Sequence, residues 1–377
     1  MRSRILHLAD LHLGETHDYL GPSADARRAE ADGVLRRITD LVLAPDSPVG
    51  GVVIAGDLFE THDPAPSLVE AVLADLTRLR AGNIRLLTVP GNHDEYSYPS
   101  SVYRRYGSRW PDRLVTNPAP EKVATWNLAG HECDLYAMAF IAGESRPPYD
   151  LIPVEPGAAR KLVVLHGSLD ANWTDRSLPL QSARLADSGL DYVALGHIHR
   201  PMEKRLGPGW VCYPGRIEGA GFADPGGADL VEIDLAAPDL TPLHRTFASR
   251  RIQEERWNLS GLDSSARLEE KLEAAADPGR IVRLRLAGVP GFGLEPDRLR
   301  QRWGSRFFHL DLRIEDEVLA APALAELAAE HTVRGVFADI AARHLEQAAD
   351  DRERRLYGAA LRHGLAAFAA GTSQESP

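Results

Sequence analysis

The sequence predicts an α/β protein with a two-sheet β-sandwich flanked by helices, a small α+β cap domain and a helical C-terminal tail. From Met1 to about Asp234, short apolar runs alternate with amphipathic stretches, which is typical of strands and helices in βαβ order. Near Arg245 this alternation changes, and from Pro322 the chain is rich in alanine at helical spacing. At 377 residues the chain is also long for one core. We therefore expect domains at residues 1–240, 241–320 and 321–377.

Hydrophobic periodicity predicts the elements of the first domain. Five apolar strands are expected at residues 5–9, 52–55, 84–89, 161–165 and 192–195. Helices are expected at 24–43 and 68–79. The runs at 122–128 and 133–140 are typical of antiparallel strands in a second sheet, and we expect 211–213 and 230–235 to continue it.

The second domain and the tail show shorter patterns. Strands are expected at 251–259, 281–286 and 307–314, and helices at 265–275 and 296–303. The tail carries two apolar stripes, Val333, Val336, Phe337 and Ile340 in one, and Tyr357, Leu361, Leu365 and Phe368 in the other. Packing back on the cap would explain these stripes, and a groove for a partner helix is the alternative.

Each of the five strands ends in a turn that carries Asp, His or Asn. The carboxyl ends of parallel strands form the sheet edge at which open α/β folds place their ligands. Residues at i and i+2 of an extended segment point to the same side, so Asp10 with His12, and His197 with His199, can each aim at one point. The candidate metal ligands are Asp10, His12, Asp57, Asn92, His166, His197 and His199.

This ligand set predicts a binuclear hydrolytic centre. Carboxylate, amide and imidazole ligands without thiolate suit Mn²⁺, Fe²⁺ or Zn²⁺, and seven ligands suit two ions. Asp57 is the natural bridge, since a carboxylate has two oxygens to share. Metal coordination can lower the pKa of water from 15.7 to about 7, so a metal-held hydroxide could attack phosphorus in line. His93, next to Asn92, is assigned transition-state stabilisation or proton donation to the leaving oxygen, and a structural role is the alternative.

Composition limits the class of protein. A hydrophobic content of 44% and a charged content of 26% are ordinary for a soluble globular chain. Only Cys133 and Cys212 are present, so neither a disulfide framework nor a thiolate zinc site is indicated. No secretory signal or apolar run of about 20 residues is found, so we expect a cytoplasmic protein without membrane association. The net charge of −11 argues against indiscriminate nucleic-acid coating but leaves a nuclease open, because two divalent cations would outweigh the charges of Asp10 and Asp57.

Two stretches are candidate DNA contacts. Aromatic residues and the three arginines Arg104, Arg105 and Arg109 interleave between residues 96 and 110, and such groups can stack on bases and bind phosphates. The alternative is a short helix whose aromatic side chains belong to the core. In the cap, Arg283 and Arg285 share one face of their strand, which is either a DNA contact or a solvated sheet face.

Five blocks, in this order, resemble the signature of calcineurin-like metallophosphoesterases: Asp10-x-His12, Gly56-Asp57, Gly91-Asn92-His93-Asp94, His166-Gly167 and Gly196-His197-x-His199. Residues 5–14, 56–59, 195–200 and 213–218 resemble the DNA-repair exonuclease branch of that family. This branch includes the nuclease subunit of the bacterial SbcCD complex and the YhaO-like proteins. The resemblance is strong to about residue 235 and loose beyond it.

The resemblance implies the metallophosphoesterase fold and a Mn²⁺-dependent DNA phosphodiesterase with 3′ to 5′ exonuclease and single-strand endonuclease activity. It implies one ion held by Asp10, His12, Asp57 and His199, and the other by Asp57, Asn92, His166 and His197. It also implies a homodimer and an SMC-like coiled-coil ATPase partner of the SbcC type that docks near the C-terminus.

One position departs from the family pattern. Some members have a second active-site histidine directly after the Gly-Asp-x-Phe block, whereas this chain has Glu60 there and His62 two residues later. Either His62 takes that catalytic role or the role is absent.

Three functions compete. The first is a DNA nuclease, favoured by the cap, whose residues 245–313 carry 14 basic against 10 acidic side chains, and by the aromatic-arginine stretch. The second is another binuclear phosphoesterase, acting on small phosphoesters, cyclic nucleotides or phosphoprotein. The third is a structural subunit that uses metals only for folding, and the complete ligand set together with His93 argues against it.

Overall fold

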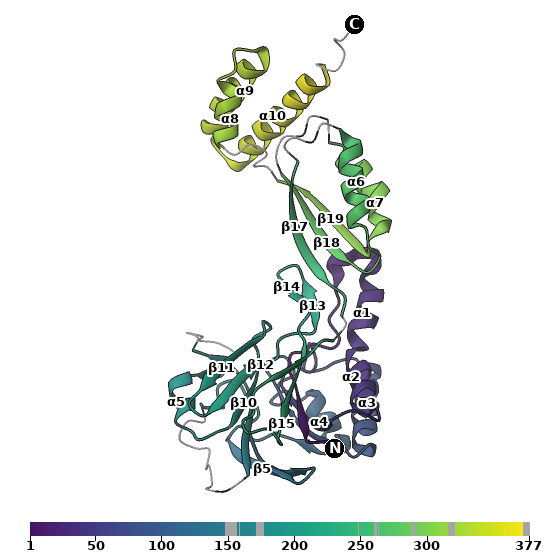
Figure 1. Cartoon of the computed structure of the whole chain (residues 1–377), viewed down its shortest axis with the longest axis vertical. Helices are drawn as coiled ribbons and strands as arrows, with labels where there is room; N and C mark the ends of the chain where they lie inside the picture. Colours follow the sequence, from purple (N-terminus) through teal and green to yellow (C-terminus); the bar gives the residue numbers. More distant parts are fainter. Residues whose placement is uncertain are drawn as a thin grey trace. The chain divides into compact units, whose positions relative to one another are not determined.

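The computed structural model describes residues 1–147, 157, 159–170, 177–247, 249–259, 262, 264–287, 290, 292, 294–315 and 321–371. The chain divides into two units, Met1–Ser249 and Arg250–Pro377. Figure 1 shows the elements of each unit. The first unit extends beyond the expected end of the first domain at residue 240. The reason is that β16 (Leu243–Arg245) pairs with β15 (Leu230–Asp234) at the edge of a sheet of that unit.

The first sheet contains the parallel strands predicted from the N-terminal part of the chain. Its order is β16-β15-β1-β2-β3-β4, with β1 at Arg4–Leu8, β2 at Val49–Ala55, β3 at Arg85–Val89 and β4 at Arg113–Leu114. Strands β1 to β4 are parallel, whereas β15 runs antiparallel to β1. The expectation that residues 230–235 continue the second sheet is therefore wrong. An apolar alternation shows that a strand has a buried face but does not identify the strand it pairs with.

The second sheet has the order β11-β12-β10-β7-β6-β5. Its strands are β5 (Glu121–Leu128), β6 (His131–Ala137), β7 (Arg160–His166), β10 (Tyr192–Gly196), β11 (Met202–Leu206) and β12 (Gly209–Tyr213). The antiparallel pair predicted from residues 122–140 is confirmed as β5 and β6, in a register that places Trp126 opposite Cys133.

The two sheets pack face to face and helices cover their outer faces, which confirms the predicted sandwich. Ile5, Val53 and Val164 are among the fully buried side chains between the sheets. Gly51 has to be a glycine, because a Cβ there would lie 2.4 Å from the ring of Trp126. The first sheet is covered by α2 (Val34–Leu43), α3 (Pro66–Ala81) and α4 (Val102–Tyr106), and the second by α5 (Ser182–Ala186). Helix α1 (Ala24–Asp32) precedes α2. The helix predicted at 24–43 is thus two helices that meet at Gly33.

Short elements complete the first unit. Turns of 3-10 helix occur at Asp18–Ser23 and Gly107–Arg109. Strand β8 (Ser168–Leu169) pairs with β9 (Pro179–Leu180), and β13 (Glu218–Gly221) forms a hairpin with β14 (Asp224–Gly226).

In the second unit, three parallel strands alternate with two helices. They are β17 (Ile252–Asn258), α6 (Ser265–Ala275), β18 (Ile281–Ala287), α7 (Pro296–Trp303) and β19 (His309–Ile314), with a 3-10 turn at Gly304–Arg306. Trp257, Leu284 and Trp303 are buried in its apolar core. The predicted cap strands and helices are confirmed within two residues at each end.

The tail forms three helices, α8 (Ala321–Ala328), α9 (Val333–Glu346) and α10 (Asp351–Gly371). The rings of Phe337 and Phe368 lie 5.6 Å apart between α9 and α10. Of the first predicted stripe, only Phe337 is used in this way, since Val333, Val336 and Ile340 are 75%, 59% and 51% exposed. Within the described residues, no helix is both long enough and apolar enough to cross a membrane.

The stability of the first unit is expected to fall in acid because His7 is buried as a neutral imidazole. His7 is fully buried on β1, and its Nδ1 lies 3.1 Å from the hydroxyl of Tyr192. Burial lowers the pKa of His7 to about 3 from its ordinary 6.5. Between these two pKa values, His7 binds a proton in the unfolded chain but not in the folded chain. The free energy of unfolding therefore decreases as pH falls from 6.5 toward 3.

The test compares the chain with its His7→Asn variant, whose side-chain amide can still reach Tyr192. Denaturant unfolding in chelator should show the original chain losing about 2 kcal/mol more than the variant between pH 6.5 and 5. Equal losses would show that His7 already binds a proton in the folded chain.

Candidate metal centre

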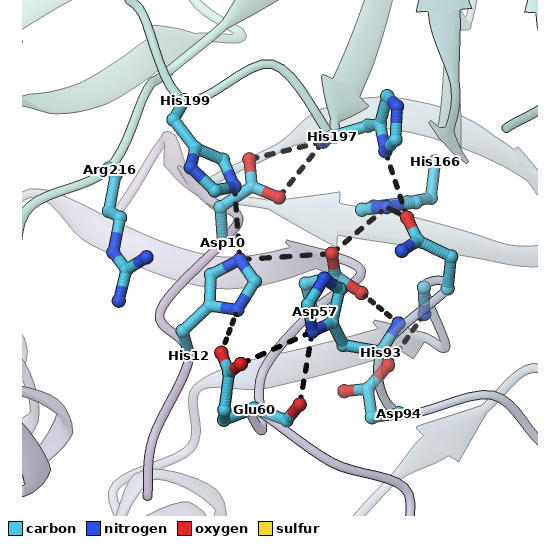
Figure 2. A network of polar contacts seen from close by, with 12 residues as sticks. Asp10, His12, Asp57, Glu60, His93, Asp94, His166, His197, His199 and Arg216 are labelled. Atoms are coloured by element: carbon cyan, nitrogen blue, oxygen red, sulfur yellow. Dashed lines mark hydrogen bonds and ion pairs between the residues drawn. The ribbon is translucent and has the colours of Figure 1, made fainter. Parts of the chain in front are cut away.

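All seven predicted ligands meet at the carboxyl ends of the strands that precede them. Figure 2 shows Asp10, His12, Asp57, His166, His197 and His199 around this point. Asp10 and His12 follow β1, Asp57 follows β2, and Asn92 follows β3, all on the first sheet. His166 ends β7, and His197 and His199 follow β10, on the second sheet. The two sheets of the sandwich thus supply opposite sides of one centre.

The first half of the centre contains Asp10, His12 and His199. The Nδ1 atoms of the two histidines lie 2.7 Å from carboxylates, His12 from Glu60 and His199 from Asp224, so each Nδ1 is expected to carry the proton. Both Nε2 atoms then present lone pairs, and these two nitrogens lie only 3.1 Å apart. A shared cation satisfies two facing lone pairs, so this arrangement fits a metal ion.

The second half contains Asp57, Asn92, His166 and His197. The Oδ1 atom of Asn92 lies 2.9 Å from Nε2 of His166 and 2.8 Å from Nδ1 of His197. The Nδ1 of His166 donates to the carbonyl of Ala55 at 2.9 Å, which leaves Nε2 facing the centre. Burial opposes a charge on His166, yet the nearby Asp57 carboxylate raises the pKa of this imidazole to about 9. The site attracts positive charge, as a cation-binding centre must.

Asp57 lies between the two halves. Its Oδ2 atom is 3.3 Å from Nε2 of His166 and 3.8 Å from Nε2 of His12, whereas Oδ1 accepts a hydrogen bond from the backbone N–H of His93 at 2.9 Å. Burial would raise the pKa of Asp57, but the adjacent His166 holds it well below its ordinary value. The carboxylate is therefore ionised and suited to bridge two cations.

Several of these residues adopt a backbone conformation that side chains rarely take. The φ angles are 53° at Asp10, 46° at His12, 51° at Asp57 and 102° at His197. Such conformations cost of order 1–3 kcal/mol each and persist where surrounding structure enforces them, often at functional sites. The glycines of the motifs allow the close packing that does so. A Cβ at Gly56 would lie 2.2 Å from Nδ1 of His166.

His93 lies beside the centre and stays accessible. Its side chain is 39% exposed, and its ring packs edge-on against that of His12 with centroids 4.7 Å apart. Nδ1 lies 3.0 Å from the main-chain carbonyl of Glu60 and 3.6 Å from the Glu60 carboxylate. The hydrogen bond with Glu60 raises the pKa of His93 to about 9, so this imidazole carries a proton at neutral pH.

The structure gives Glu60, rather than His62, the position beside His93. The Glu60 carboxylate lies against both His12 and His93, whereas the His62 ring stacks on Tyr98 with centroids 4.1 Å apart. In the sequence, Glu60 stands out only as a departure from the family pattern.

Two further carboxylates of the site were not predicted from the sequence. Asp94 is fully buried and accepts hydrogen bonds from the N–H groups of Gly91, Leu58 and Phe59 and from the hydroxyl of Tyr103. It thereby joins the loop that bears Asp57 to the loop that bears His93. Its position in the Gly-Asn-His-Asp block is the feature of the sequence that could have identified Asp94 as a residue of the site. Asp224, the partner of His199, lies in a stretch with no recognisable motif.

The arginines proposed to contact DNA already have protein partners. Arg105 pairs with Asp63, Arg109 makes two 2.6 Å contacts with Glu70, and Arg104 packs over the ring of Tyr96. On the sheet face of the cap, the ion pairs are Arg283 with Glu254 and Asp311, and Arg285 with Glu254 and Glu315. Tyr103 and Trp110 are buried, so these two aromatics belong to the core.

Comparison with known proteins agrees with this geometry. Residues 3–201 match the family model for calcineurin-like phosphoesterases. The chain is 26% identical over 296 residues to the DNA double-strand break repair protein Mre11 of Halobacterium salinarum, covering 76% of this chain and 71% of that one. It is 28% identical over 304 residues to Mre11 of Haloferax volcanii, covering 76% and 62%. It is 26% identical over 275 residues to the D subunit of the nuclease SbcCD of Bacillus subtilis, covering 62% and 66%.

The family model covers more than half of the chain, and its span contains every candidate ligand from Asp10 to His199. By name, the matched relatives are a DNA double-strand break repair protein and a component of a nuclease, and part of their length lies outside the match. The chain belongs to the calcineurin-like phosphoesterase family.

Proposed function

We propose that this chain is a metal-dependent DNA phosphodiesterase of DNA repair, with 3′ to 5′ exonuclease and single-strand endonuclease activity. The observation that carries the proposal is the convergence of seven metal-ligand side chains at one edge of the sandwich, with the protonated His93 beside them. The similarity to Mre11 and to the D subunit of SbcCD supports DNA as the substrate.

The ligand set supports two divalent ions, and we propose Mn²⁺, with Fe²⁺ or Zn²⁺ compatible with the same ligands. Asp10, His12 and His199 would hold one ion, Asn92, His166 and His197 the other, and Asp57 would bridge them. When bound, such ions polarise phosphate oxygens and activate water.

The protein's own residues would orient the phosphodiester and supply a proton. His93 is held through Nδ1 by the carbonyl of Glu60, which leaves Nε2 for the substrate. A protonated Nε2 would stabilise negative charge on the phosphate and then donate its proton to the leaving oxygen.

A second candidate, hydrolysis of small phosphoesters, is favoured by one observation. Arg105, Arg109, Arg283 and Arg285 are each paired with carboxylates, so contact with a DNA backbone requires these ion pairs to open. A small ester would need none of them.

The deciding experiment compares substrates under one set of conditions. We expect the chain with Mn²⁺ to degrade linear DNA from its 3′ ends and to nick single strands, and to be far less active on bis-p-nitrophenyl phosphate and cyclic nucleotides. Cleavage of the small esters alone would replace the proposed function with the second candidate.

We also propose a homodimer and a coiled-coil ATPase partner of the SMC type. The Bacillus subtilis relative is named as a subunit of SbcCD, so at least one relative acts within a complex. The exposed apolar side chains of Val333, Val336 and Ile340 on α9 support a docking surface near the C-terminus.

Charge reversal at Arg104 and Arg105 is expected to weaken DNA binding and to flatten its salt dependence. Phosphate contacts release counterions, so losing one or two contacts should reduce the slope of log K against log salt by about 1–2. The matched control reverses Lys204 and Arg205 on β11, which are similarly exposed and also ion-paired. If both double variants show the same slope, the arginines of α4 are structural.

A further inference from the structure

We infer that Arg216 and Asp224 are positioning residues that pre-form one half of the metal centre, the half that contains His12 and His199. This inference rests on the proposed binuclear function. It concerns a set of contacts that we call the Arg216 network, defined as Arg216, Asp224 and Glu15.

The network holds both the main chain and the imidazole ring of His199. The backbone N–H of Arg216 donates to the carbonyl of His199 at 2.8 Å. The ring of His199 meets the carboxylate of Asp224 through Nδ1 at 2.7 Å, and the guanidinium of Arg216 donates to the same Asp224 oxygen at 3.3 Å. One residue thus fixes the main chain of the ligand directly and its imidazole through a carboxylate.

The same arginine reaches the loop that carries His12. Its guanidinium forms an ion pair with Glu15, and the backbone N–H of Glu15 donates to the carbonyl of His12 at 3.4 Å. The Nε of Arg216 donates to the carbonyl of Glu218 at 2.7 Å, which anchors it on the β13–β14 hairpin. Figure 2 shows Arg216 on the side of His199, across the centre from His166.

Arg216 is only 3% exposed, so these contacts operate largely away from water. Charge-assisted hydrogen bonds are strong in such surroundings, and a buried arginine keeps its charge. The network therefore joins two loops from different sheets and keeps the Nε2 atoms of His12 and His199 3.1 Å apart. Without it, forming this half would require ordering both loops when the ion binds.

The other half is built differently. His166 is oriented by the main-chain carbonyl of Ala55 at 2.9 Å, and His197 faces Asn92 at 2.8 Å. Neither contact involves the Arg216 network. Disturbing that network should therefore weaken one ion and leave the other, an asymmetry that general destabilisation of the fold would not produce.

The experiment measures Mn²⁺ binding by the full chain, using calorimetry and metal analysis after dialysis, without reference to catalysis. The original chain is expected to bind two ions. In Asp224→Ala and Arg216→Gln, one ion should bind about 10–100-fold more weakly, the range for lost partners of metal-bound histidines, while the other keeps its affinity. Asp224→Asn, which still accepts a hydrogen bond from His199 and leaves Arg216 paired with Glu15, should show a smaller loss.

Two controls make the result decisive. Arg205→Gln removes an exposed arginine paired with Asp239 at 2.8 Å and should leave both affinities unchanged. Thermal unfolding in chelator should show that Asp224→Ala and Asp224→Asn are both folded. Two unchanged affinities in Asp224→Ala, or an equal loss of both, would overturn the inference while leaving the proposed function intact. An original chain that binds fewer than two ions would overturn the proposed binuclear function itself.

Discussion

Asp57→Ala is expected to lose both metal ions together and, with them, all measurable hydrolysis. The Oδ2 atom of Asp57 is the oxygen within 4 Å of Nε2 in both His12 and His166, so it faces the two halves at once. Removal of this carboxylate deletes a ligand from each half. It also removes the negative charge that raises the pKa of His166, and a site with less negative charge attracts cations less strongly.

Metal content after dialysis against Mn²⁺ checks this prediction, with hydrolysis of linear DNA measured in parallel. Asp40→Ala is the matched control, because this carboxylate is 57% exposed and pairs with Arg78 on the outer helices. A variant that keeps one ion at full affinity would show that Asp57 serves a single half. This pattern differs from the one expected for Asp224→Ala, in which a single ion is weakened.

The convergence of the seven candidate ligands could be predicted because each lies where a local pattern and a general rule coincide. Asp10, Asp57 and Asn92 each follow an apolar run, and the parallel strands of the first sheet bring such ends to one edge. The second sheet adds His166, His197 and His199 from the facing side. The cap was predictable for a similar reason, since α6 and the strands beside it have clear helical and alternating periodicity.

What could not be predicted depends on partners far apart in the chain. Residues 230–235 have the alternation of a strand, but only the fold shows that β15 pairs with β1. Asp224 is 25 positions from His199, and nothing in its own neighbourhood marks it as a partner of an imidazole. The arginines were recognisable as cations, yet the acidic side chains that neutralise them, such as Glu70 opposite Arg109, come from other helices.

His93→Ala is expected to keep both metal ions and to lose about 10²–10⁴-fold in turnover, the usual contribution of a general acid. The side chain of His93 lies with those of Glu60 and His12 and is not one of the seven proposed ligands, and its backbone N–H, which supports Asp57, survives the substitution. The alternative, a structural histidine, predicts a loss of metal with little loss of turnover per bound metal centre.

Imidazole added to His93→Ala separates these cases. Because the His93 side chain is 39% exposed, the substitution leaves a space open to solvent, where free imidazole can take its place beside Glu60. Turnover should rise with imidazole concentration in this variant and stay unchanged in the original chain. His62→Ala is the matched control, since its ring stacks on Tyr98 and should affect turnover little. Full activity of His93→Ala with two bound ions would exclude His93 as the proton donor. It would indicate that solvent protonates the leaving oxygen.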